Sequence, residues 1–356
     1  MEATQKVDNS SLQSVETSMG GHVSSVATHT VEVRRDWFTG RVSVIAAARS
    51  KRPILVRPPP LTPQKTCPFC RGNERMTPPA EMVALLRPRD VRLEFGEEAA
   101  NTHTWDIRVF PNMFPAVSSN IPPDDPSAYG HHLIVVETPD HARDLNQLNI
   151  RQIEMYLKVL LFEYVRLSSD RQIKCVSIFK NYGEEGGASI PHAHTQIIAS
   201  RMVPPKTVSE LKAFRSFERD RHRSAISVLA RQAREDGRQV LDRWGYVAFV
   251  PYAPIEPFEL WVAPEKVSRS ITEGLQVRQF ANVLKALLSA MKKIHGEVAY
   301  NFYFHLPPKG ARRFHWHMEI LPRTNKLAGY EFGFGAYIIT VRPEDAARLY
   351  RQALIA

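Results

Sequence analysis

The chain has 356 residues, of which 43% are hydrophobic and 24% charged, as in an ordinary soluble globular protein. This length is sufficient for one large domain or two domains of ordinary size. No segment approaches the ~20 apolar residues of a membrane span, and the three cysteines are too few for a disulfide scaffold. These features exclude an integral membrane protein and favour a reducing compartment, so we expect a cytoplasmic protein.

The formal net charge of +10 is compatible with nucleic acid or with small anionic substrates. The basic residues concentrate locally at 201–235, where they alternate with acids, which is typical of a solvated helix face. The sequence contains no arginine-rich tail and no aromatic–basic RNA-binding motif. We therefore expect no nucleic acid partner, and we keep a non-catalytic basic zinc protein that binds nucleic acid as the alternative from another class.

The first segment, residues 1–30, is polar, rich in Ser, Thr and Val, and without hydrophobic periodicity. It lacks the apolar stretch that a signal peptide needs. We predict a disordered tail.

The sequence CPFC places the thiols of Cys67 and Cys70 at metal-ligand spacing. No second CxxC is present, so a closed zinc site would need two ligands from elsewhere, for which His141 and His192 are the best placed of the 13 histidines. The spacing alone leaves two alternatives open, a redox pair and two unrelated cysteines.

Two parts of the chain show the same order of predicted elements. The first comprises strand 131–139, helix 150–167, strand 174–180, a glycine-rich turn and the strand HAHTQIIAS. The second comprises strand 257–264, helix 275–294, strand 300–306, a loop and the strand FHWHMEILP. This repeat predicts an α+β fold made of two tandem units, each with a helix packed on an antiparallel sheet.

Each unit carries a His-x-His pair, His192 with His194 and His315 with His317. Side chains two apart on a strand point to the same face, so the members of each pair are expected to project together. One pair would more often be an amphipathic strand that happens to carry histidines. Two pairs at equivalent places in a repeat indicate a function.

Six segments together resemble the galactose-1-phosphate uridylyltransferase family of the histidine-triad superfamily. In chain order they are DWFTGRVSVIAAARSKRP (36–53), CPFCRGNE (67–74), RVFPNMFPAV (108–117), HHLIVVETPDHARDL (131–145), FKNYGEEGGASIPHAHTQ (179–196) and FHWHMEILPRTNKLAGYE (314–331). The resemblance extends from residue 31 to the C-terminus. It implies two histidine-triad-like halves, 31–205 with the nucleophile and the zinc site, and 206–356.

The resemblance also implies a double displacement through a covalent nucleotidyl–histidine. The nucleophile would be His194, with Gln196 and Ser189 contacting the phosphoryl oxygens. The first hypothesis is a UDP-glucose–hexose-1-phosphate uridylyltransferase of galactose metabolism, which binds a nucleotide sugar and a sugar 1-phosphate. The alternative within this class is an ADP-glucose or dinucleotide phosphorylase that uses the same histidine.

Further site residues follow from the same resemblance. The substrate-contacting residues would be Arg49, Arg52, Asn112, Asn181, Tyr330 and Glu331. In the family the arginines act across a subunit interface, which implies a homodimer. A structural zinc ion would be held by Cys67, Cys70, His141 and His192. A second metal, iron or zinc, would be held by Glu210, His305, His315 and His317. Two departures, Ala193 for Pro and Ile339 for Asn, leave the base and the sugar open.

Overall fold

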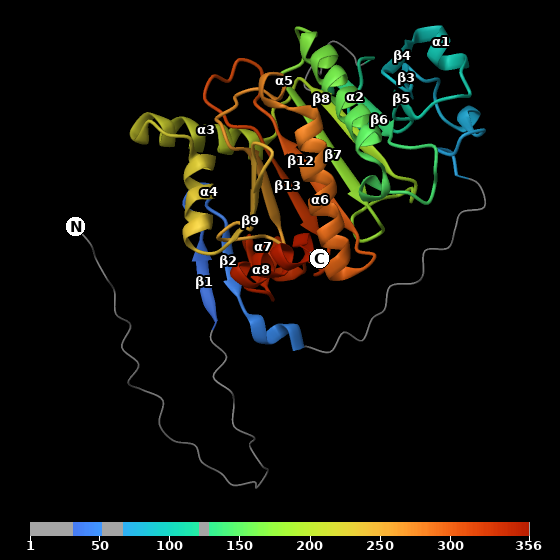
Figure 1. Ribbon diagram of the computed structural model, residues 1–356. Coiled ribbons are helices and arrows are strands. Elements are labelled where there is room, and N and C mark those ends of the chain that lie inside the picture. The colour runs from blue at the N-terminus through green and yellow to red at the C-terminus, as the bar shows by residue number, and fades with distance from the viewer. Residues whose placement is uncertain (1–30, 52–66, 121–127, 356) are drawn as a thin grey trace, which may run out of the picture. The chain divides into compact units, whose positions relative to one another are not determined.

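Eleven of the described strands form one antiparallel sheet, which crosses the middle of Figure 1. The computed structural model describes residues 31–51, 67–120 and 128–355. In spatial order the strands are β4 (Val91–Phe95), β3 (Met82–Leu86), β5 (Ile107–Pro111), β6 (Gly130–Val136), β8 (His194–Ser200), β7 (Cys175–Tyr182), β12 (Tyr300–His305), β13 (His317–Pro322), β11 (Leu260–Pro264), β10 (Tyr246–Phe249) and β9 (Gln239–Arg243).

The order of the central strands is mirrored about the pair β7–β12. On one side β7 is followed by β8 and β6, and on the other side β12 is followed by β13 and β11. The central pair is antiparallel and sets Asn301 opposite Asn181. This arrangement confirms an α+β fold of two tandem units with antiparallel strands. The division at residue 205 stays a prediction, because the sheet continues through both units.

Two long helices cover one face of the sheet, α2 (Ile150–Ser169) and α6 (Val277–His295), and they pack against each other in Figure 1. Both carry a continuous apolar stripe, which is the reason the sequence predicted helices over 150–167 and 275–294. A capping box fixes the start of α2, where Asn149 accepts from the backbone of Gln152. α8 (Pro343–Ile355) packs beside α6.

The opposite face is covered at its two ends. At one end α3 (Pro205–Arg221) and α4 (Ala225–Glu235) pack Phe214 and Leu229 over β10 and β11. At the other end Phe69 of the CPFC turn packs over β5 and β6. Between these ends lies a groove of about 470 Å³ over β7 and β12. The predicted solvated helix face within 201–235 corresponds to α3, of which a single residue is buried.

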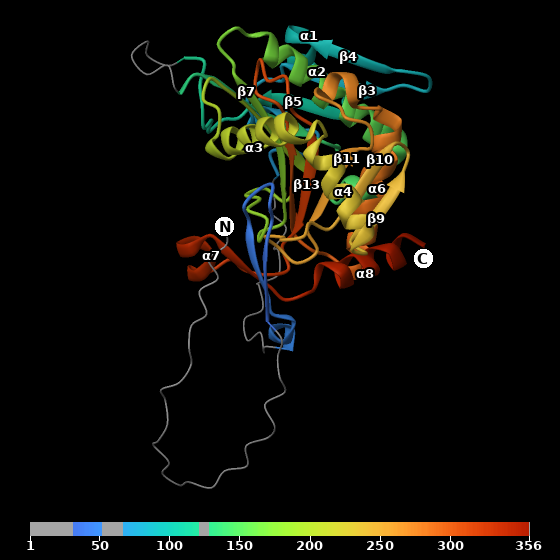
Figure 2. The same ribbon diagram turned by 90° about the vertical axis from the view of Figure 1, so that its left-hand side faces the viewer.

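A small three-stranded sheet lies beside the large one and is prominent in Figure 2. It contains β1 (Glu32–Arg35), β2 (Val42–Ile45) and β14 (Ala336–Ile339), with β14 parallel to β2. The shorter helical elements are η1 (Ala47–Lys51), η2 (Glu74–Met76), α1 (Gly96–Asn101), η4 (Leu145–Gln147), α5 (Ile271–Gly274) and α7 (Gly329–Phe334). Among the described residues no helix has the length and apolarity needed to cross a membrane. The tail predicted for 1–30 lies outside the described residues.

The strands that carry the histidine pairs begin later than predicted. β8 starts at His194 and β13 at His317, so His192 and His315 precede their strands. Pro191 has no N–H to contribute to a ladder, which is one reason why β8 cannot begin earlier. The two members of a pair therefore do not share one strand, because the first histidine of each pair lies in the connecting segment. His192 and His194 still project to the same side, since both rings pack against Phe69.

A buried network of charges lies on the helix-covered side of the sheet, directly behind β8. Lys180 is fully buried and donates to the carboxylates of Glu137 and Asp144. Thr195 donates to Glu137 at 2.7 Å, and Tyr300 donates to Asp144 at 2.7 Å. The two carboxylates raise the pKa of Lys180 against the opposing effect of burial, so the ammonium group stays charged.

Replacing Lys180 with Met should lower the free energy of unfolding by about 3–5 kcal/mol, because two carboxylates would remain buried without their cation. Urea denaturation measures this change. Lys174→Met is the matched control, since Lys174 is exposed on the segment leading to the same strand, and its cost should stay within about 0.5 kcal/mol. Equal stabilities of the two variants would contradict a structural role for the network.

Candidate active site

His194 is the first residue of β8, and its ring lies on the face of the sheet away from α2 and α6. The next residue, Thr195, points to the other face, where Tyr156 of α2 contacts it at 2.7 Å. The Nδ1 atom of His194 lies 2.8 Å from the carbonyl oxygen of His192. A carbonyl accepts only, so Nδ1 carries the proton and Nε2 keeps its lone pair.

The free nitrogen of His194 is open to attack an electrophile. Nε2 makes no hydrogen bond with a described residue. It is also absent from the buried side-chain atoms that lack a hydrogen-bond partner, so it is accessible to solvent. Burial lowers the pKa of His194 to about 4, and the nearby Lys180 acts in the same direction. The ring is therefore neutral at pH 7, which is the state that a nucleophile needs.

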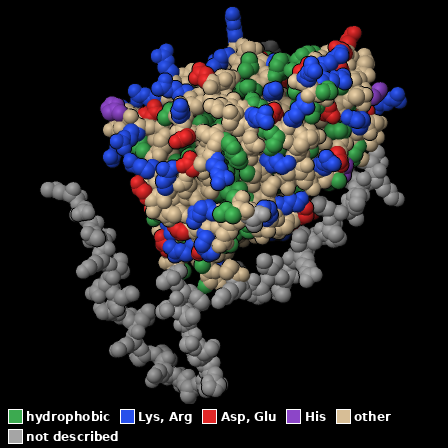
Figure 3. Space-filling model, in the orientation of Figure 1, with side chains coloured by type: hydrophobic (Ala, Val, Ile, Leu, Met, Phe, Trp, Pro, Cys, Tyr) green, Lys and Arg blue, Asp and Glu red, His purple; other side chains and the backbone are tan. Residues whose placement is uncertain are grey.

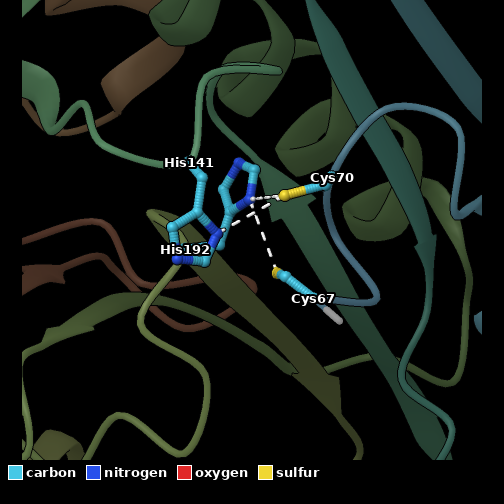
Figure 4. A group of neighbouring side chains, drawn as sticks. All are labelled: Cys67, Cys70, His141 and His192. Atoms are coloured by element: carbon cyan, nitrogen blue, oxygen red, sulfur yellow. Dashed lines mark hydrogen bonds between the residues drawn. The ribbon is translucent and has the colours of Figure 1, made fainter. Parts of the chain in front are cut away.

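The four predicted zinc ligands come together in one cluster, shown in Figure 4. Nδ1 of His192 lies 3.7 Å from the Cys67 sulfur and 3.6 Å from the Cys70 sulfur, and Nδ1 of His141 lies 3.4 Å from Cys70. Tetrahedral zinc, with bonds of about 2.3 Å to sulfur and about 2.0 Å to nitrogen, sets such atoms about 3.5 Å apart. The cluster is thus consistent with a zinc site.

The protonation states in the cluster also suit a metal. Nε2 of His192 lies 2.7 Å from the carbonyl oxygen of Thr138, so the proton is on Nε2 and the lone pair of Nδ1 faces the thiols. Burial and the adjacent Cys67 sulfur raise the pKa of Cys70 to about 11. Without a cation Cys70 is therefore a neutral thiol at pH 7, and a bound metal ion would be needed to stabilise its thiolate form.

Phe69, between the two cysteines, joins the cluster to His194. Its ring packs edge-on against His194, with the ring centroids 5.2 Å apart, and is almost completely buried. Sequence reasoning missed this residue. An aromatic side chain inside CxxC was the available signal, but the spacing does not reveal what it packs against.

The second histidine pair repeats the backbone geometry of the first. Nδ1 of His317 lies 3.1 Å from the carbonyl oxygen of His315, as His194 does from His192. Nε2 of His315 lies 3.0 Å from the carbonyl oxygen of Pro264, as His192 does from Thr138. The environments differ, since Nδ1 of His315 meets the Ser224 hydroxyl at 2.8 Å where His192 meets two thiols.

Three of the four residues predicted for a second metal lie together, namely Glu210, His305 and His317. Nε2 of His317 faces Glu210 at 3.2 Å and is sealed from solvent. Glu210 and His305 are 2.7 Å apart. The prediction that His315 is the fourth ligand was wrong, because hydrogen bonds to Ser224 and to Pro264 engage both of its ring nitrogens.

Sequence reasoning also missed Glu319, which contacts this second group. Its carboxylate lies 3.0 Å from Nε2 of His305 and is neutralised by Arg41, which bridges Glu319 and Glu259. Burial acts to lower the pKa of His305, but the carboxylates of Glu210 and Glu319 outweigh this effect and raise the pKa to about 9. A protonated His305 thus balances the charge of Glu210, to which its Nδ1 is hydrogen-bonded at 2.7 Å, as a metal ion would.

Gln196, predicted to contact the phosphoryl oxygens, and Asn181, predicted to contact substrate, both lie on the open face of the sheet. Gln196 follows His194 by two positions on β8, so it shares that face. Asn181 also lies there, because its strand neighbour Phe179 is paired with Gln196. Asn112 lies next to His132, which in turn contacts Gln196 at 2.9 Å. The sequence analysis did not single out His132.

Ser189 is exposed in the loop that precedes His192. The loop depends on glycine at two points: Gly183 has a φ of +75°, and a Cβ at Gly186 would lie 2.3 Å from the Tyr182 carbonyl oxygen. This tight backbone brings the NYGEEGGAS segment to the end of β7, beside the start of β8.

Of the predicted substrate-contacting residues, three do not contact His194 or Gln196, and a fourth lies outside the described residues. Arg49 is exposed on η1, and Tyr330 is exposed on α7. Glu331 accepts from the backbone of Ala328 at 2.9 Å, within its own helix turn. Between described residues, no hydrogen bond or ion pair links these three to His194 or Gln196. Arg52 lies outside the described residues.

Comparisons with known proteins show which family and which fold this chain resembles. Residues 29–204 match the family model described as galactose-1-phosphate uridyl transferase, N-terminal domain. An ADP-glucose phosphorylase of Arabidopsis thaliana is 27% identical over 354 residues, covering 94% of this chain and 96% of its own. A galactose-1-phosphate uridylyltransferase of Thermotoga maritima is 27% identical over 345 residues, covering 90% and 98%.

The crystal structure of an Arabidopsis ADP-glucose phosphorylase with bound ADP-glucose superimposes with a TM-score of 0.75 at 27% identity, and covers 91% of this chain and 99% of its own. The fold and the open histidine thus define an enzyme of the class that contains nucleotidyltransferases and phosphorylases. Residues 29–204 match this family's N-terminal domain, and they belong to the galactose-1-phosphate uridyl transferase family, which confirms the resemblance seen in the sequence.

The environment of His194 predicts the pH dependence of its reaction. Because the pKa of the ring is lowered to about 4, the neutral form persists through the acid range. For the free enzyme, kcat/KM should stay level from about pH 8 to about pH 5 and fall only below that. A pH profile with stopped-flow detection measures this. A descending limb with a midpoint near the ordinary histidine pKa of about 6.5 would contradict the description.

Proposed function

We propose that the protein transfers a nucleotidyl group from a nucleoside diphosphate sugar to a phosphate-bearing acceptor, with His194 as the covalent carrier. The observation that carries this proposal is the state of the His194 ring. One nitrogen is held by a backbone carbonyl and the other is unprotonated and open. A buried histidine with a purely structural role would have both nitrogens engaged, as His315 has.

The reaction proceeds in two displacements at the α-phosphorus. Nε2 of His194 forms a bond to phosphorus as the bond to the bridging oxygen breaks, and sugar 1-phosphate leaves with that oxygen. A phosphate oxygen of the acceptor then attacks the same phosphorus and the phosphorus–nitrogen bond breaks. Gln196 is placed to donate to the phosphoryl oxygens, whose charge increases in both transition states.

The leading assignment is uridylyl transfer from UDP-glucose to a hexose 1-phosphate, which would place the protein in galactose metabolism. The second candidate is phosphorolysis of ADP-glucose, where inorganic phosphate is the acceptor. The relatives favour neither strongly, since the phosphorylase and the uridylyltransferase are both 27% identical over more than nine-tenths of their length. A dinucleotide phosphorylase would use the same histidine.

A homodimer would complete the site. Apolar side chains of α7 are exposed, with Phe332 at 76% and Phe334 at 78%, and Arg49 is exposed as well. Isolated apolar patches of this kind often mark a protein interface. Because Arg49 and Tyr330 do not reach His194 of their own chain, a second copy is the source that we propose for these contacts.

For the cysteine–histidine cluster we propose a structural zinc ion. Four protein ligands leave no open position for water, so the ion would hold the CPFC turn against the His192 segment. All three cysteines are unpaired thiols, which supports the cytoplasmic location expected from the sequence. For Glu210, His305 and His317 the three donors could hold iron or zinc, and metal analysis decides between a metal and protonated His305.

Mixing the protein with a panel of nucleotide sugars should produce a covalent adduct on His194. Intact mass spectrometry gives the mass of the nucleotide and hence the base. His194→Ala should abolish the adduct, whereas His317→Ala, its counterpart in the second half, should retain it per folded molecule. No adduct with any nucleotide sugar would overturn the proposal.

The acceptor is decided by two parallel assays, UDP-glucose with galactose 1-phosphate and ADP-glucose with inorganic phosphate. Turnover in the first mixture supports the uridylyltransferase, and turnover only in the second supports the phosphorylase. Salt-dependent binding of DNA or RNA without any adduct would instead support the nucleic acid alternative. Figure 3 weighs against that alternative, since Lys and Arg are interspersed with acidic side chains over the face shown.

Cys67→Ser should release the zinc ion and lower the melting temperature, because an opened site no longer joins the CPFC turn to His192. Metal content by mass spectrometry and thermal unfolding measure the two effects. Cys175→Ser is the matched control, as Cys175 is also a buried free thiol but lies outside the cluster. Full zinc content and full stability in Cys67→Ser would refute the assignment.

A further inference from the structure

His132 of β6 is a buried histidine that the chemistry above leaves without a role. It is 8% exposed and lies on the same face as His194, because its neighbour across the strands, Ile198, is two positions beyond Gln196. Three contacts surround the ring: the Ala116 N–H at 3.1 Å from Nδ1, and Gln196 and Asn112 at 2.9 and 3.3 Å from Nε2.

The backbone of Ala116 determines which nitrogen of His132 carries the proton. A backbone N–H can only donate, so Nδ1 of His132 must offer its lone pair. Burial lowers the pKa of His132, which keeps the ring neutral with its single proton on Nε2. Nε2–H is therefore a donor, and it points at the side chain of Gln196.

The direction of the Gln196 amide follows from this tautomer. The atom 2.9 Å from a donor must be the amide oxygen Oε1, so the NH₂ group of Gln196 is turned away from His132. This NH₂ group has no acceptor among the described residues and is not sealed from solvent. It shares the face of the strand with His194, where an incoming phosphate would lie.

Asn112 is oriented in a similar way from the other side. Its Oδ1 accepts from the Phe114 N–H at 2.9 Å, so its NH₂ group is the end that lies near His132. Two donors facing each other do not form a hydrogen bond. The NH₂ group of Asn112 is therefore also available to an acceptor that enters the site.

We propose that His132 is a positioning residue, which fixes the Gln196 amide so that its NH₂ group, and not its carbonyl, faces the transferred phosphoryl group. The inference rests on the proposed nucleotidyl transfer. It goes beyond that proposal because it assigns the donor and the acceptor of each hydrogen bond. The Ala116 N–H donates to His132, His132 donates to Gln196, and Gln196 donates to the phosphate. With the amide reversed, a carbonyl oxygen would oppose the anionic phosphate.

Two substitutions separate the two ends of the ring. His132→Asn keeps an acceptor at the level of Nδ1 but has no donor that reaches Gln196. His132→Gln places an amide NH₂ at the level of Nε2 and can restore that donor. His131→Asn is the matched control, because His131 precedes it on β6 and contacts Asp170 rather than Gln196.

The rate of adduct formation in a single turnover should fall about 10- to 100-fold in His132→Asn, with little change in the KM for the nucleotide sugar. His132→Gln should recover most of the rate, and His131→Asn should match the unaltered chain. In a Gln196→Ala background His132→Asn should cause no further loss, whereas a merely structural role would multiply the two losses.

A second readout does not need activity. With histidine labelled by ¹⁵N, the NMR spectrum of the unaltered protein should show His132 as the Nε2–H tautomer at neutral pH. In uniformly ¹⁵N-labelled protein, the side-chain amide signals of Gln196 should shift in His132→Asn and stay in place in His131→Asn.

The outcomes distinguish the two proposals. An inactive protein with the Nε2–H tautomer and the Gln196 shift would refute nucleotidyl transfer but retain the orientation of the amide. An active protein with an Nδ1–H tautomer, or with multiplicative losses in the double variant, would overturn the role of His132.

Discussion

The site depends on two hydrogen bonds made by one residue, His192. Its ring donates from Nε2 to the Thr138 carbonyl, which turns Nδ1 towards the two thiols. Its own carbonyl accepts from Nδ1 of His194, which leaves Nε2 of His194 unprotonated. The cysteine–histidine cluster and the His194 ring therefore both depend on one residue. A displacement of this segment would change both the geometry of the cluster and the tautomer of His194.

The second half has the same backbone geometry around its histidine pair, but different side chains surround the rings. His315 and His317 repeat both hydrogen bonds to carbonyl oxygens, but a hydroxyl of Ser224 occupies the position of the thiols. Nε2 of His317 is sealed against Glu210 instead of facing solvent. The repeated unit thus determines which ring nitrogen is protonated, and the neighbouring side chains determine whether the other nitrogen can react. This explains why Nε2 of His194 is accessible while Nε2 of His317 is enclosed by protein.

The sequence predicted the features that follow from periodicity and spacing. The helices α2 and α6 were predicted from their continuous apolar stripes. The cysteine–histidine cluster was predicted because a closed zinc site needs two ligands besides the CxxC cysteines, and His141 and His192 were the best placed. The sequence did not predict contacts that depend on which strands become neighbours. His132 contacts Gln196 because β6 pairs with β8, and Glu319 meets His305 because β13 pairs with β12. The wrong prediction of His315 as a metal ligand also arose from contacts that the sequence does not reveal. Its ring nitrogens are hydrogen-bonded to Ser224 and to the Pro264 carbonyl, residues far from it in the chain.

Three histidine rings of the site are each oriented by a backbone group that cannot reverse its role. The carbonyl of His192 orients His194, the carbonyl of Thr138 orients His192, and the N–H of Ala116 orients His132. A side-chain partner could rotate or exchange a proton, but a peptide carbonyl only accepts and a peptide N–H only donates. The donors and the lone pair are therefore in position before any ligand binds, which spares the reaction the free energy of reorienting them when charge develops on phosphate. The close packing of β6, β8 and the CPFC turn serves this purpose, because it keeps these backbone groups within hydrogen-bonding distance of the rings they orient.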